Sequence, residues 1–313
     1  MWQGERVTIH PVAPGEPRRP SGPRDPGDAW VEAPDGTRYW GRFGAAGLLA
    51  VDPARGVLLQ HRVSWSHFGD TWGVPGGALH QGEPAVAGAL REAAEEAGVP
   101  QGGIRPWLVS LLDLGYWSYT TLVGEVVEPF EPTISDPESH ALEWVPVDLV
   151  ADRPLHPGFA AAWEHLRPAL AVRPAVVVDA ANVVGSVPDG WWRDRVGATQ
   201  RLLGRIAGLA GRGVPAAALE LAEQVWFPGW TVVVEGRARG VTDQPGIAVI
   251  RAEGAGDDKE RKQRIAAEAE RLRDAGRTVL VVTSDRGLAG RVADAGAAVR
   301  PAGWLLDLLG PVA

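Results

Sequence analysis

Apolar residues in the first part of the chain occur in short runs that are typical of β-strands. Residues 43–51 and residues 56–62 form two such runs, separated by an Asp-Pro pair. Before them, segments 30–31 and 39–40 flank an Asp-Gly pair, which predicts a short hairpin. We expect these strands to begin a sheet.

Residues 84–97 follow the 3.6-residue period of an α-helix instead. Pro84 suits the first helical turn, and Gly98 suits the position just after the last one. One face carries the apolar residues Val86, Leu90, Ala93 and Ala97, and another carries Glu92, Glu95 and Glu96. Because Ala85, Gly88 and Ala89 lie on the acidic side, nothing bulky is expected between that face and a ligand.

Further strands are expected after this helix. Residues 107–114 and 116–127 read as an antiparallel pair. Residues 129–137 read as a proline-rich acidic loop, and segment 138–147 leads from a loop into a closing strand at Trp144-Val145-Pro146. Residues 159–166 have a short apolar helical pattern between prolines.

The second half alternates β-branched runs with helical patterns. The expected strands are 175–178, 231–234, 247–251 and 278–283, and the expected helices are 191–210 and 258–275, the latter with Ile265, Ala269 and Leu272 at core spacing. Such alternation predicts a parallel sheet with helices on both faces. The fold class is therefore α/β overall.

The amino-acid composition indicates where the domains begin and end. Residues 1–28 are rich in Pro, Gly and Arg without apolar periodicity, which predicts a flexible arm. We expect one domain at 29–150, a linker at 151–173 and a second domain at 174–313.

With no cysteine and no apolar run of membrane length, the protein is expected to be cytoplasmic, without disulfides and without membrane partners. The net charge of −8 is concentrated before residue 174, which argues against broad nucleic-acid binding by the first domain.

Three adjacent carboxylates on one helix repel one another unless a cation binds them. Hard divalent ions such as Mg²⁺ and Mn²⁺ prefer oxygen ligands and bridge phosphates. The spacing strengthens this interpretation, because the chain carries every fixed position of the pattern G-x5-E-x7-R-E-U-x-E-E-x-G-U. Those positions are Gly77, Glu83, Arg91, Glu92, Glu95, Glu96, Gly98 and Val99, with a small Ala93 at the aliphatic position. The segment resembles the Nudix box of Nudix hydrolases.

This resemblance implies an α/β/α sandwich with a mixed sheet and a diphosphatase that cleaves nucleoside diphosphate derivatives with Mg²⁺ or Mn²⁺. It assigns Glu95, Glu96 and the backbone of Gly76 to metal binding, and Glu92 to metal binding or to proton abstraction from water. Gly77, Glu83 and Arg91 are implied to be structural or orienting residues. A loop glutamate before the closing strand, Glu138 or alternatively Glu143, is implied as a further catalytic acid.

Aromatic and basic residues precede the box. Trp65, Phe68 and Trp72 are candidates for stacking on a nucleobase, with Arg62 beside them, although each aromatic ring could equally fill the core.

Acids follow the expected strands of the second domain. Asp179, Glu235 and Asp285 each end a strand, and Asp257-Asp258 opens a helix after another. Because the carboxyl ends of parallel strands meet at one sheet edge, these acids predict a second Mg²⁺ or Mn²⁺ site for phosphodiester cleavage. Asp257 and Asp258 could alternatively be simple helix caps.

The second-domain motifs resemble those of NYN-type, PIN-like ribonucleases. The motifs are Asp179-Ala180-Ala181-Asn182, Gly256-Asp257-Asp258 and Val282-Thr283-Ser284-Asp285-Arg286, with Ala180 where that family often has glycine. The resemblance implies a Rossmann-like parallel sheet and RNA cleavage by the acids, assisted by Asn182 and Ser284. Arg193, Arg237, Arg239, Lys259 and Arg286 could hold RNA phosphates, and Trp191-Trp192 could stack on bases.

Two other classes of protein are alternatives to this interpretation. A nucleotide-sensing regulator, or an RNA-processing protein with only one catalytic domain, is the alternative to an enzyme with two activities. A sensor usually goes with loss of box glutamates, and none is lost here. A diphosphate isomerase would favour a cysteine nucleophile, and the chain has none.

Overall fold

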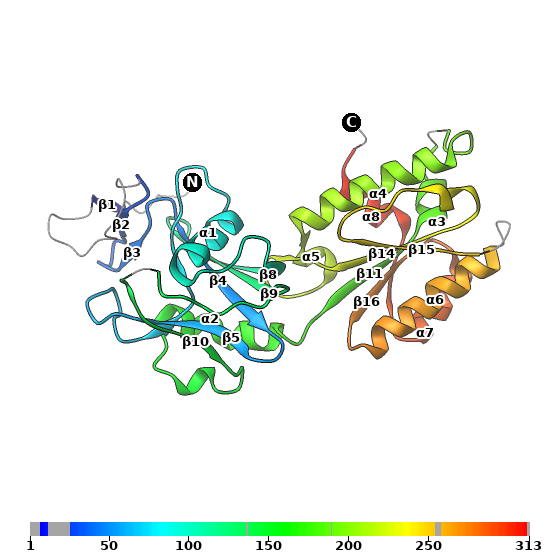
Figure 1. Ribbon diagram of the computed structural model, residues 1–313. Helices are drawn as coiled ribbons and strands as arrows, with labels where there is room; N and C mark the ends of the chain where they lie inside the picture. Colours follow the sequence, from blue (N-terminus) through cyan, green and yellow to red (C-terminus); the bar gives the residue numbers. More distant parts are fainter. Residues whose placement is uncertain (1–6, 12–25, 136, 189, 254–257, 312–313) are drawn as a thin grey trace. The chain divides into compact units, whose positions relative to one another are not determined.

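The computed structural model describes residues 7–11, 26–135, 137–188, 190–253 and 258–311. The chain divides into two compact units, Met1–Ala169 with Ala222–Val225, and Leu170–Leu221 with Trp226–Ala313. Both contain strands and helices, so the fold is mixed α/β as the sequence predicts (Figure 1). Among the described helices, none combines the length and apolar character that a membrane span requires.

A small antiparallel sheet begins the first unit. It pairs β1 (Thr8–Pro11), β2 (Ala29–Glu32) and β3 (Arg38–Trp40) in that order. Trp30 lies opposite Trp40, which confirms the predicted hairpin. The prediction of a flexible arm at residues 1–28 is wrong for β1. The side chains of this strand are mostly exposed, so its sequence shows no alternation of apolar and polar residues. The other residues of that arm before Pro26 lie outside the described ranges, apart from Val7.

The larger sheet of the first unit is mixed. Its strands follow the order β10-β5-β4-β9-β8, in which β4 and β9 are parallel and the other neighbours are antiparallel. The bounds are β4 (Ala45–Asp52), β5 (Gly56–Arg62), β8 (Ile104–Asp113), β9 (Ser118–Val126) and β10 (Ser139–Val145). Short strands β6 (Trp72–Gly73) and β7 (Gly76–Ala78) pair with β5 and β4. The predicted strands and the antiparallel pair after the helix are confirmed.

Helix α1 (Ala85–Ala97) packs against β4 and β7 (Figure 1). Pro84 precedes it in an extended conformation, and Gly98 ends it with φ 67°, a left-handed angle that favours glycine. The predicted helix is therefore confirmed within one residue.

The segment expected to be a linker, 151–173, is instead largely part of the first unit. It contains the end of η1 (Val150–Asp152) and helix α2 (Pro157–Ala169), and the first unit extends to Ala169. Phe159, Trp163 and Leu166 are buried on α2. These spaced apolar residues give α2 a packed face, which an independent linker would not need.

The second unit is built on a parallel sheet with the order β15-β14-β11-β16-β17 among the described residues. The strand bounds are β11 (Pro174–Asp179), β14 (Gly229–Val234), β15 (Ile247–Arg251), β16 (Thr278–Val282) and β17 (Ala298–Arg300). The helices are α3 (Ala180–Gly185), α4 (Arg195–Arg212), α6 (Asp258–Asp274), α7 (Arg286–Asp294) and α8 (Ala302–Leu309). Shorter elements are β12 (Val214–Pro215), α5 (Ala216–Leu219), β13 (Val225–Trp226) and η2 (Gly236–Gly240). The helix predicted at 191–210 begins later, at Arg195, because Asp194 caps it by accepting from the Gly197 N–H at 2.8 Å.

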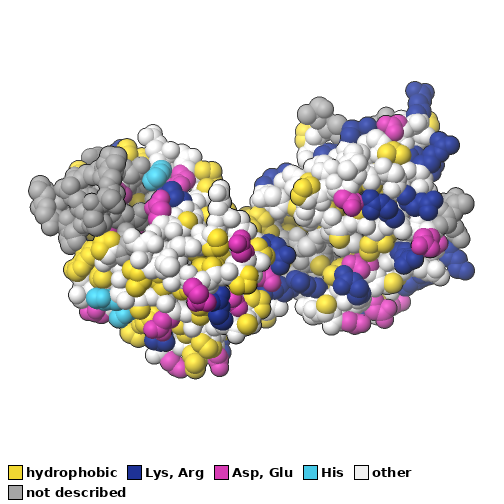
Figure 2. Space-filling model, in the orientation of Figure 1, with side chains coloured by type: hydrophobic (Ala, Val, Ile, Leu, Met, Phe, Trp, Pro, Cys, Tyr) yellow, Lys and Arg dark blue, Asp and Glu magenta, His cyan; other side chains and the backbone are white. Residues whose placement is uncertain are grey.

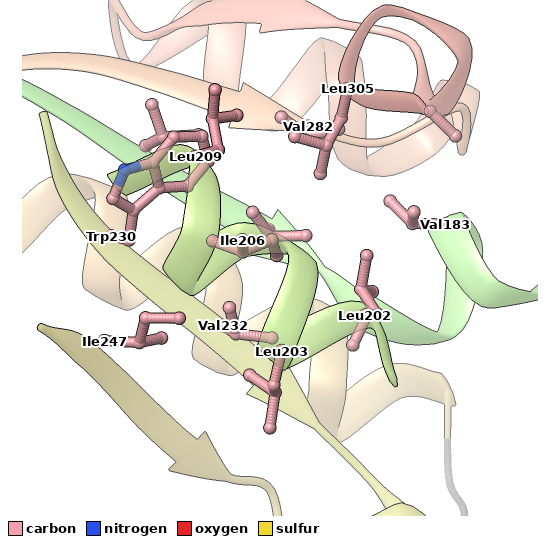
Figure 3. Packing of buried hydrophobic residues seen from close by; sticks show 14 of the residues in the cluster. Val183, Leu202, Leu203, Ile206, Leu209, Trp230, Val232, Ile247, Val282 and Leu305 are labelled. Carbon is pink, nitrogen blue, oxygen red and sulfur yellow. The ribbon is translucent and has the colours of Figure 1, made fainter. Parts of the chain in front are cut away.

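Alternate strand residues supply two separate cores. Val176 and Val178 of β11 face α3, α4 and α8, whereas Val177 faces α6 and α7. Figure 3 shows the first core, where α4 packs its leucines and Ile206 against Val232 and Trp230 of β14. This two-sided burial explains the near-continuous apolar runs in the sequence and confirms a parallel sheet covered by helices on both faces.

Candidate active site

Two of the three glutamates on α1 are buried against the sheet. Glu92 is 2% exposed and Glu96 is 3% exposed, while the Glu95 side chain is 47% exposed. The expected open space beside them is absent at Gly88, where an added Cβ would lie 2.3 Å from a methyl carbon of Leu79. The acidic face of α1 therefore points toward the β7 segment rather than toward bulk solvent.

Arg91 organises the acids at the start of this face. Its Nε and Nη2 donate to the two carboxylate oxygens of Glu83 at 2.8 and 2.9 Å, and Nη2 also donates to the Ala78 carbonyl at 3.1 Å. Its Nη1 donates to Glu92 Oε1 at 2.8 Å and to Glu95 Oε2 at 3.3 Å. A bidentate guanidinium fixes orientation as well as charge.

This contact has a clear electrostatic result. The hydrogen bonds from Arg91, together with that from the His80 N–H at 3.0 Å, lower the pKa of Glu83 to about 2. The pKa of Arg91 is raised, mainly by the same carboxylate. Both groups therefore remain charged at any pH at which the protein would work, and their geometry does not depend on titration.

Glu96 is held by the backbone and by a residue that the sequence analysis missed. Its Oε2 accepts from the Gly76 N–H at 2.9 Å and from Gln60 Nε2 at 3.4 Å. Gln60 also donates to Ser139 Oγ at 2.7 Å, while its Oε1 is buried without a hydrogen-bond partner among the described residues. The sequence signal for this role was that Gln60 is a single amide within the apolar run of β5.

Tyr119 is a second missed residue near the glutamates. Burial raises the pKa of its hydroxyl, and the nearby Glu96 and Glu92 raise it further. A Cβ added to Gly47 would lie 2.3 Å from that hydroxyl, so the ring fits only against glycine. The phenol therefore remains a protonated hydrogen-bond donor.

The donor set of this site suits a hard divalent cation. Carboxylates of Glu92, Glu95 and Glu96, the backbone of Gly76 and the unpaired oxygen of Gln60 are all oxygen donors. Among the residues that the structure describes, no three His, Cys, Asp or Glu side chains already form a complete metal-binding group. The chemistry thus fits a cation whose coordination also includes water and substrate phosphate.

The two candidate loop acids differ in their surroundings. Glu138 is half-buried next to β10, and its carbonyl accepts from the Val63 N–H at 3.0 Å. Its neighbour Ser139 contacts Gln60, which in turn contacts Glu96. Glu143 is instead bound to Arg153, which donates to it at 2.7 Å. Glu138 is thus connected through two residues to the glutamates of α1.

The aromatic candidates separate into core and surface. Trp72 is 5% exposed and stacks on His61 at 4.7 Å, which favours the alternative that this ring fills the core. It is buried because β6 pairs with β5 and brings the ring over His61. Trp65 and Phe68 are exposed at 46% and 47%. Arg62 donates to the His67 carbonyl at 3.3 Å at the base of their loop.

The loop that carries these rings has a constrained backbone. Phe68 and Asp70 adopt left-handed φ angles of 53° and 60°, which non-glycine residues rarely do. The Phe68 ring contacts His156 edge-on at 4.9 Å, and burial lowers the pKa of His156 to about 4. Strained residues of this kind cluster at ligand sites, so an exposed ring held in this way is a candidate contact.

The acids of the second unit do converge at one sheet edge. Asp179 is fully buried and accepts from Asn182 N at 3.2 Å and from Thr283 Oγ1 at 3.1 Å. Asn182 Oδ1 accepts from the Ser284 N–H at 2.7 Å, and Ser284 Oγ accepts from the Ala302 N–H at 3.1 Å. Asn182 and Ser284 therefore connect the ends of β11 and β16. Asp257 lies outside the described residues.

Two cations that the sequence analysis left out lie among these acids. Arg261 contacts Asp179 at 3.2 Å and also pairs with Glu235 and Asp258. Lys262 contacts Asp258 at 2.5 Å and Asp285 at 2.7 Å. All four described acids of the predicted metal site are thus paired with a cationic side chain. Arg261 and Lys262 therefore contact the same carboxylates that the sequence predicts as metal ligands.

A pocket of about 470 Å³ adjoins this cluster. Asn182, Ser284, Glu235 and Arg261 line one part of it, and Trp191, Arg195 and Thr199 line another. The Arg195 guanidinium lies 5.2 Å from the centre of the Trp191 ring. A cation next to an aromatic face is a common way to bind a nucleotide.

Comparisons with known proteins match the first unit. The NUDIX domain family matches residues 41–166. A Mycobacterium tuberculosis protein named "Putative 8-oxo-dGTP diphosphatase 3" is 45% identical over 166 residues, which are 50% of this chain and 76% of that protein. A Bifidobacterium longum protein named "Nucleoside triphosphate pyrophosphatase/Nudix hydrolase fusion protein" is 40% identical over 44% of this chain and 30% of its own length. The crystal structure of the Nudix hydrolase RenU from M. smegmatis is 46% identical, covers 46% of this chain and 96% of its own, and has a TM-score of 0.41.

Gly77 should be intolerant of any side chain. A Cβ there would lie 2.7 Å from the carboxyl carbon of Glu92, which is buried and held by Arg91. We expect Gly77→Ala to lower the free energy of unfolding by about 1–3 kcal/mol, measured by urea denaturation. Gly73→Ala is the matched control, because its Cβ would approach only His156, at 3.8 Å. Equal stability of the two variants would contradict the steric account.

Proposed function

Because the chain belongs to the Nudix hydrolase family, we propose that its first unit hydrolyses a phosphoric anhydride bond in a nucleoside diphosphate derivative. The observation that carries the proposal is the buried pair Glu92 and Glu96, oriented by Arg91 and by the Gly76 N–H. An oxidised purine nucleoside triphosphate is the substrate class we favour, because the relative that is 45% identical is named an 8-oxo-dGTP diphosphatase.

Water adds across the P–O–P bond in this reaction, which yields a nucleotide and the phosphorylated remainder. A bound Mg²⁺ would neutralise phosphoryl charge and acidify a bound water. Glu92, Glu95, Glu96 and the Gly76 backbone would hold it, and Arg91 orients Glu92 while it remains paired with Glu83. We assign proton acceptance from the attacking water to Glu92 or Glu138. The charge of Glu83 matters here, since a neutral Glu83 would release Arg91 toward the metal-binding acids.

Phe68 is proposed as the base contact in this unit. Its ring is exposed, its backbone is strained, and His67 and His156 hold it edge-on at 4.2 and 4.9 Å. A purine stacked on this ring would gain about 1–3 kcal/mol. Trp65 and Arg62 lie in or beside the same loop and are secondary candidates.

For the second unit, we propose RNA binding rather than cleavage, so that only the Nudix unit is catalytic. The resemblance of its motifs to NYN-type, PIN-like proteins and the pocket beside Trp191 support binding. Figure 2 shows Lys and Arg side chains spread over the visible face of this unit. We favour binding over the cleavage predicted from the sequence because Arg261 and Lys262 pair with all four described acids.

Glu96→Gln should remove diphosphatase activity without unfolding the protein. The amide keeps an acceptor for the Gly76 N–H but loses the charge that a cation needs, so turnover with Mg²⁺ should fall at least about 100-fold. Activity is measured by ion-exchange chromatography as the nucleotide product formed from 8-oxo-dGTP, dGTP and ADP-ribose. Glu125→Gln, which removes a surface charge paired with Arg105 at 2.8 Å, is the control. Near-normal turnover in a folded Glu96→Gln would place the site elsewhere.

Phe68→Ala should weaken substrate binding more than turnover. Loss of one stacking contact predicts a KM for 8-oxo-dGTP that is about tenfold higher with kcat nearly unchanged. Steady-state kinetics on both variants checks this, with Leu112→Ala as a control at a similarly exposed apolar residue. An unchanged KM in Phe68→Ala would rule out the stacking role.

Trp191→Ala should reduce RNA affinity about tenfold in the full chain. Binding of a labelled single-stranded RNA is measured by fluorescence anisotropy in EDTA, at low and at high salt. We expect affinity to fall with salt, as phosphate contacts require. Leu149→Ala, another exposed apolar position, is the control. Absence of binding by the wild type, or equal affinity of the variant, would contradict the proposal.

A further inference from the structure

The Arg261 side chain fills the centre of the acid cluster in the second unit. The residue is 8% exposed, and its guanidinium contacts Asp179 at 3.2 Å while pairing with Glu235 and Asp258. These acids come from the end of β11, the end of β14 and the start of α6. One planar group therefore bridges three elements that a metal ion would otherwise have to bridge.

Lys262 closes the same cluster on its outer side. Its Nζ lies 2.5 Å from Asp258 Oδ2 and 2.7 Å from Asp285 Oδ2, and its side chain is 22% exposed. Asp258 is thus shared between both cations. Asp285 also accepts from the Leu288 N–H at 2.8 Å as the N-cap of α7. Each of the four described acids therefore contacts at least one cationic side chain.

The position of Arg261 is fixed by the core. One turn further along α6, Ile265 is fully buried against the sheet, and Ala269 continues the same contact. The guanidinium is therefore carried by a helix whose register cannot shift without exposing that core. A chance surface contact would lack this anchoring.

We propose that Arg261 and Lys262 are built-in counter-ions that occupy the place of a divalent cation, so that the acid cluster of the folded chain does not bind Mg²⁺ or Mn²⁺. The cluster stabilises the junction of β11, β14, β16 and α6 by charge pairing. This inference is independent of the diphosphatase function, and it departs from the metal site that the strand-end acids predict.

Four carboxylates and two cations make this arrangement sensitive to loss of either cation. Glu235 Oε2 is buried and has no hydrogen-bond partner among the described residues, so negative charge is already in excess. Without Arg261, the fully buried carboxylate of Asp179 would lie near those of Glu235 and Asp258 with no arginine between them. A divalent ion is then the natural replacement, and the variant should acquire the metal site that the wild type lacks.

The test uses Mn²⁺ binding by the full chain in a Glu95→Gln/Glu96→Gln background, which removes the acids proposed to bind metal in the first unit. Bound Mn²⁺ is measured by electron paramagnetic resonance, and thermal unfolding is recorded in EDTA and in MnCl₂. Arg261→Met and Arg261→Gln are compared with the background. Each should bind Mn²⁺ about tenfold or more tightly than the background and be stabilised by it. Adding Asp179→Asn should abolish this gain.

Each outcome decides the proposal. Mn²⁺ binding by the background that is lost on adding Asp179→Asn would overturn it, because the cluster would then accept metal despite Arg261. If Mn²⁺ binding by the background survives Asp179→Asn, that ion is bound at another site. The gain in Mn²⁺ affinity of the Arg261 variants then decides the proposal. Variants that fold only with Mn²⁺ support the proposal. Variants that gain no Mn²⁺ affinity, or that remain unfolded in its presence, would overturn it.

Discussion

A carboxylate can be buried only if a cation or a hydrogen-bond donor compensates it, and both units are arranged around this constraint. Glu92, Glu96 and Asp179 are each at most 3% exposed. The free energy needed to desolvate one such charge is several kcal/mol, and leaving it unpaired costs a similar amount. The donors near these acids therefore determine how the strands and helices around them are held.

The two units meet the constraint in opposite ways. In the first unit, Arg91 binds Glu83 through two hydrogen bonds and touches Glu92 with its remaining nitrogen. Glu96 accepts hydrogen bonds from a backbone N–H and an amide, which lower its electrostatic cost without cancelling its charge. The carboxylates therefore retain affinity for an additional cation. The same reasoning explains why the structure places Arg91 beside Glu83 rather than among all three helix acids.

In the second unit, the arginine lies inside the cluster. The contacts of Arg261 with Asp179, Glu235 and Asp258 use most of its guanidinium, and Lys262 takes Asp258 and Asp285. Burial raises the pKa of Asp179, while the charge of Arg261 and the hydrogen bonds from Asn182 and Thr283 lower it. The net effect is a raised pKa, so these contacts compensate the buried charge of Asp179 in part.

Much of the backbone could be predicted because its signals are local. The strands β4 and β5, the helix α1 with its Pro84 and Gly98 ends, and the alternation of the second unit all follow from periodicity and turn residues. β1 could not be predicted, since a strand with exposed side chains has no apolar pattern. The burial of Trp72 could not be predicted, because the sequence does not show which face of a strand meets its neighbours.

Site residues divide along the same line. The acids of both clusters could be found from spacing, because a helix face or the ends of parallel strands bring them together. The roles of Gln60 and Arg261 could not be found in this way. Gln60 contacts Glu96, 36 positions away in the sequence, and Arg261 contacts Asp179, 82 positions away. Spacing thus identifies where carboxylates converge but not which cation compensates them.

The compensating group, rather than the number of acids, decides what such a cluster does. Arg261 lies only three residues after Asp258, so it can reach back over the first turn of α6 and meet acids from two strands. Arg91 lies immediately before Glu92 and holds Glu83 with two hydrogen bonds, while Glu92 and Glu95 receive one each. A difference of a few residues in helix position therefore separates an arginine that orients a cation site from one that replaces the cation.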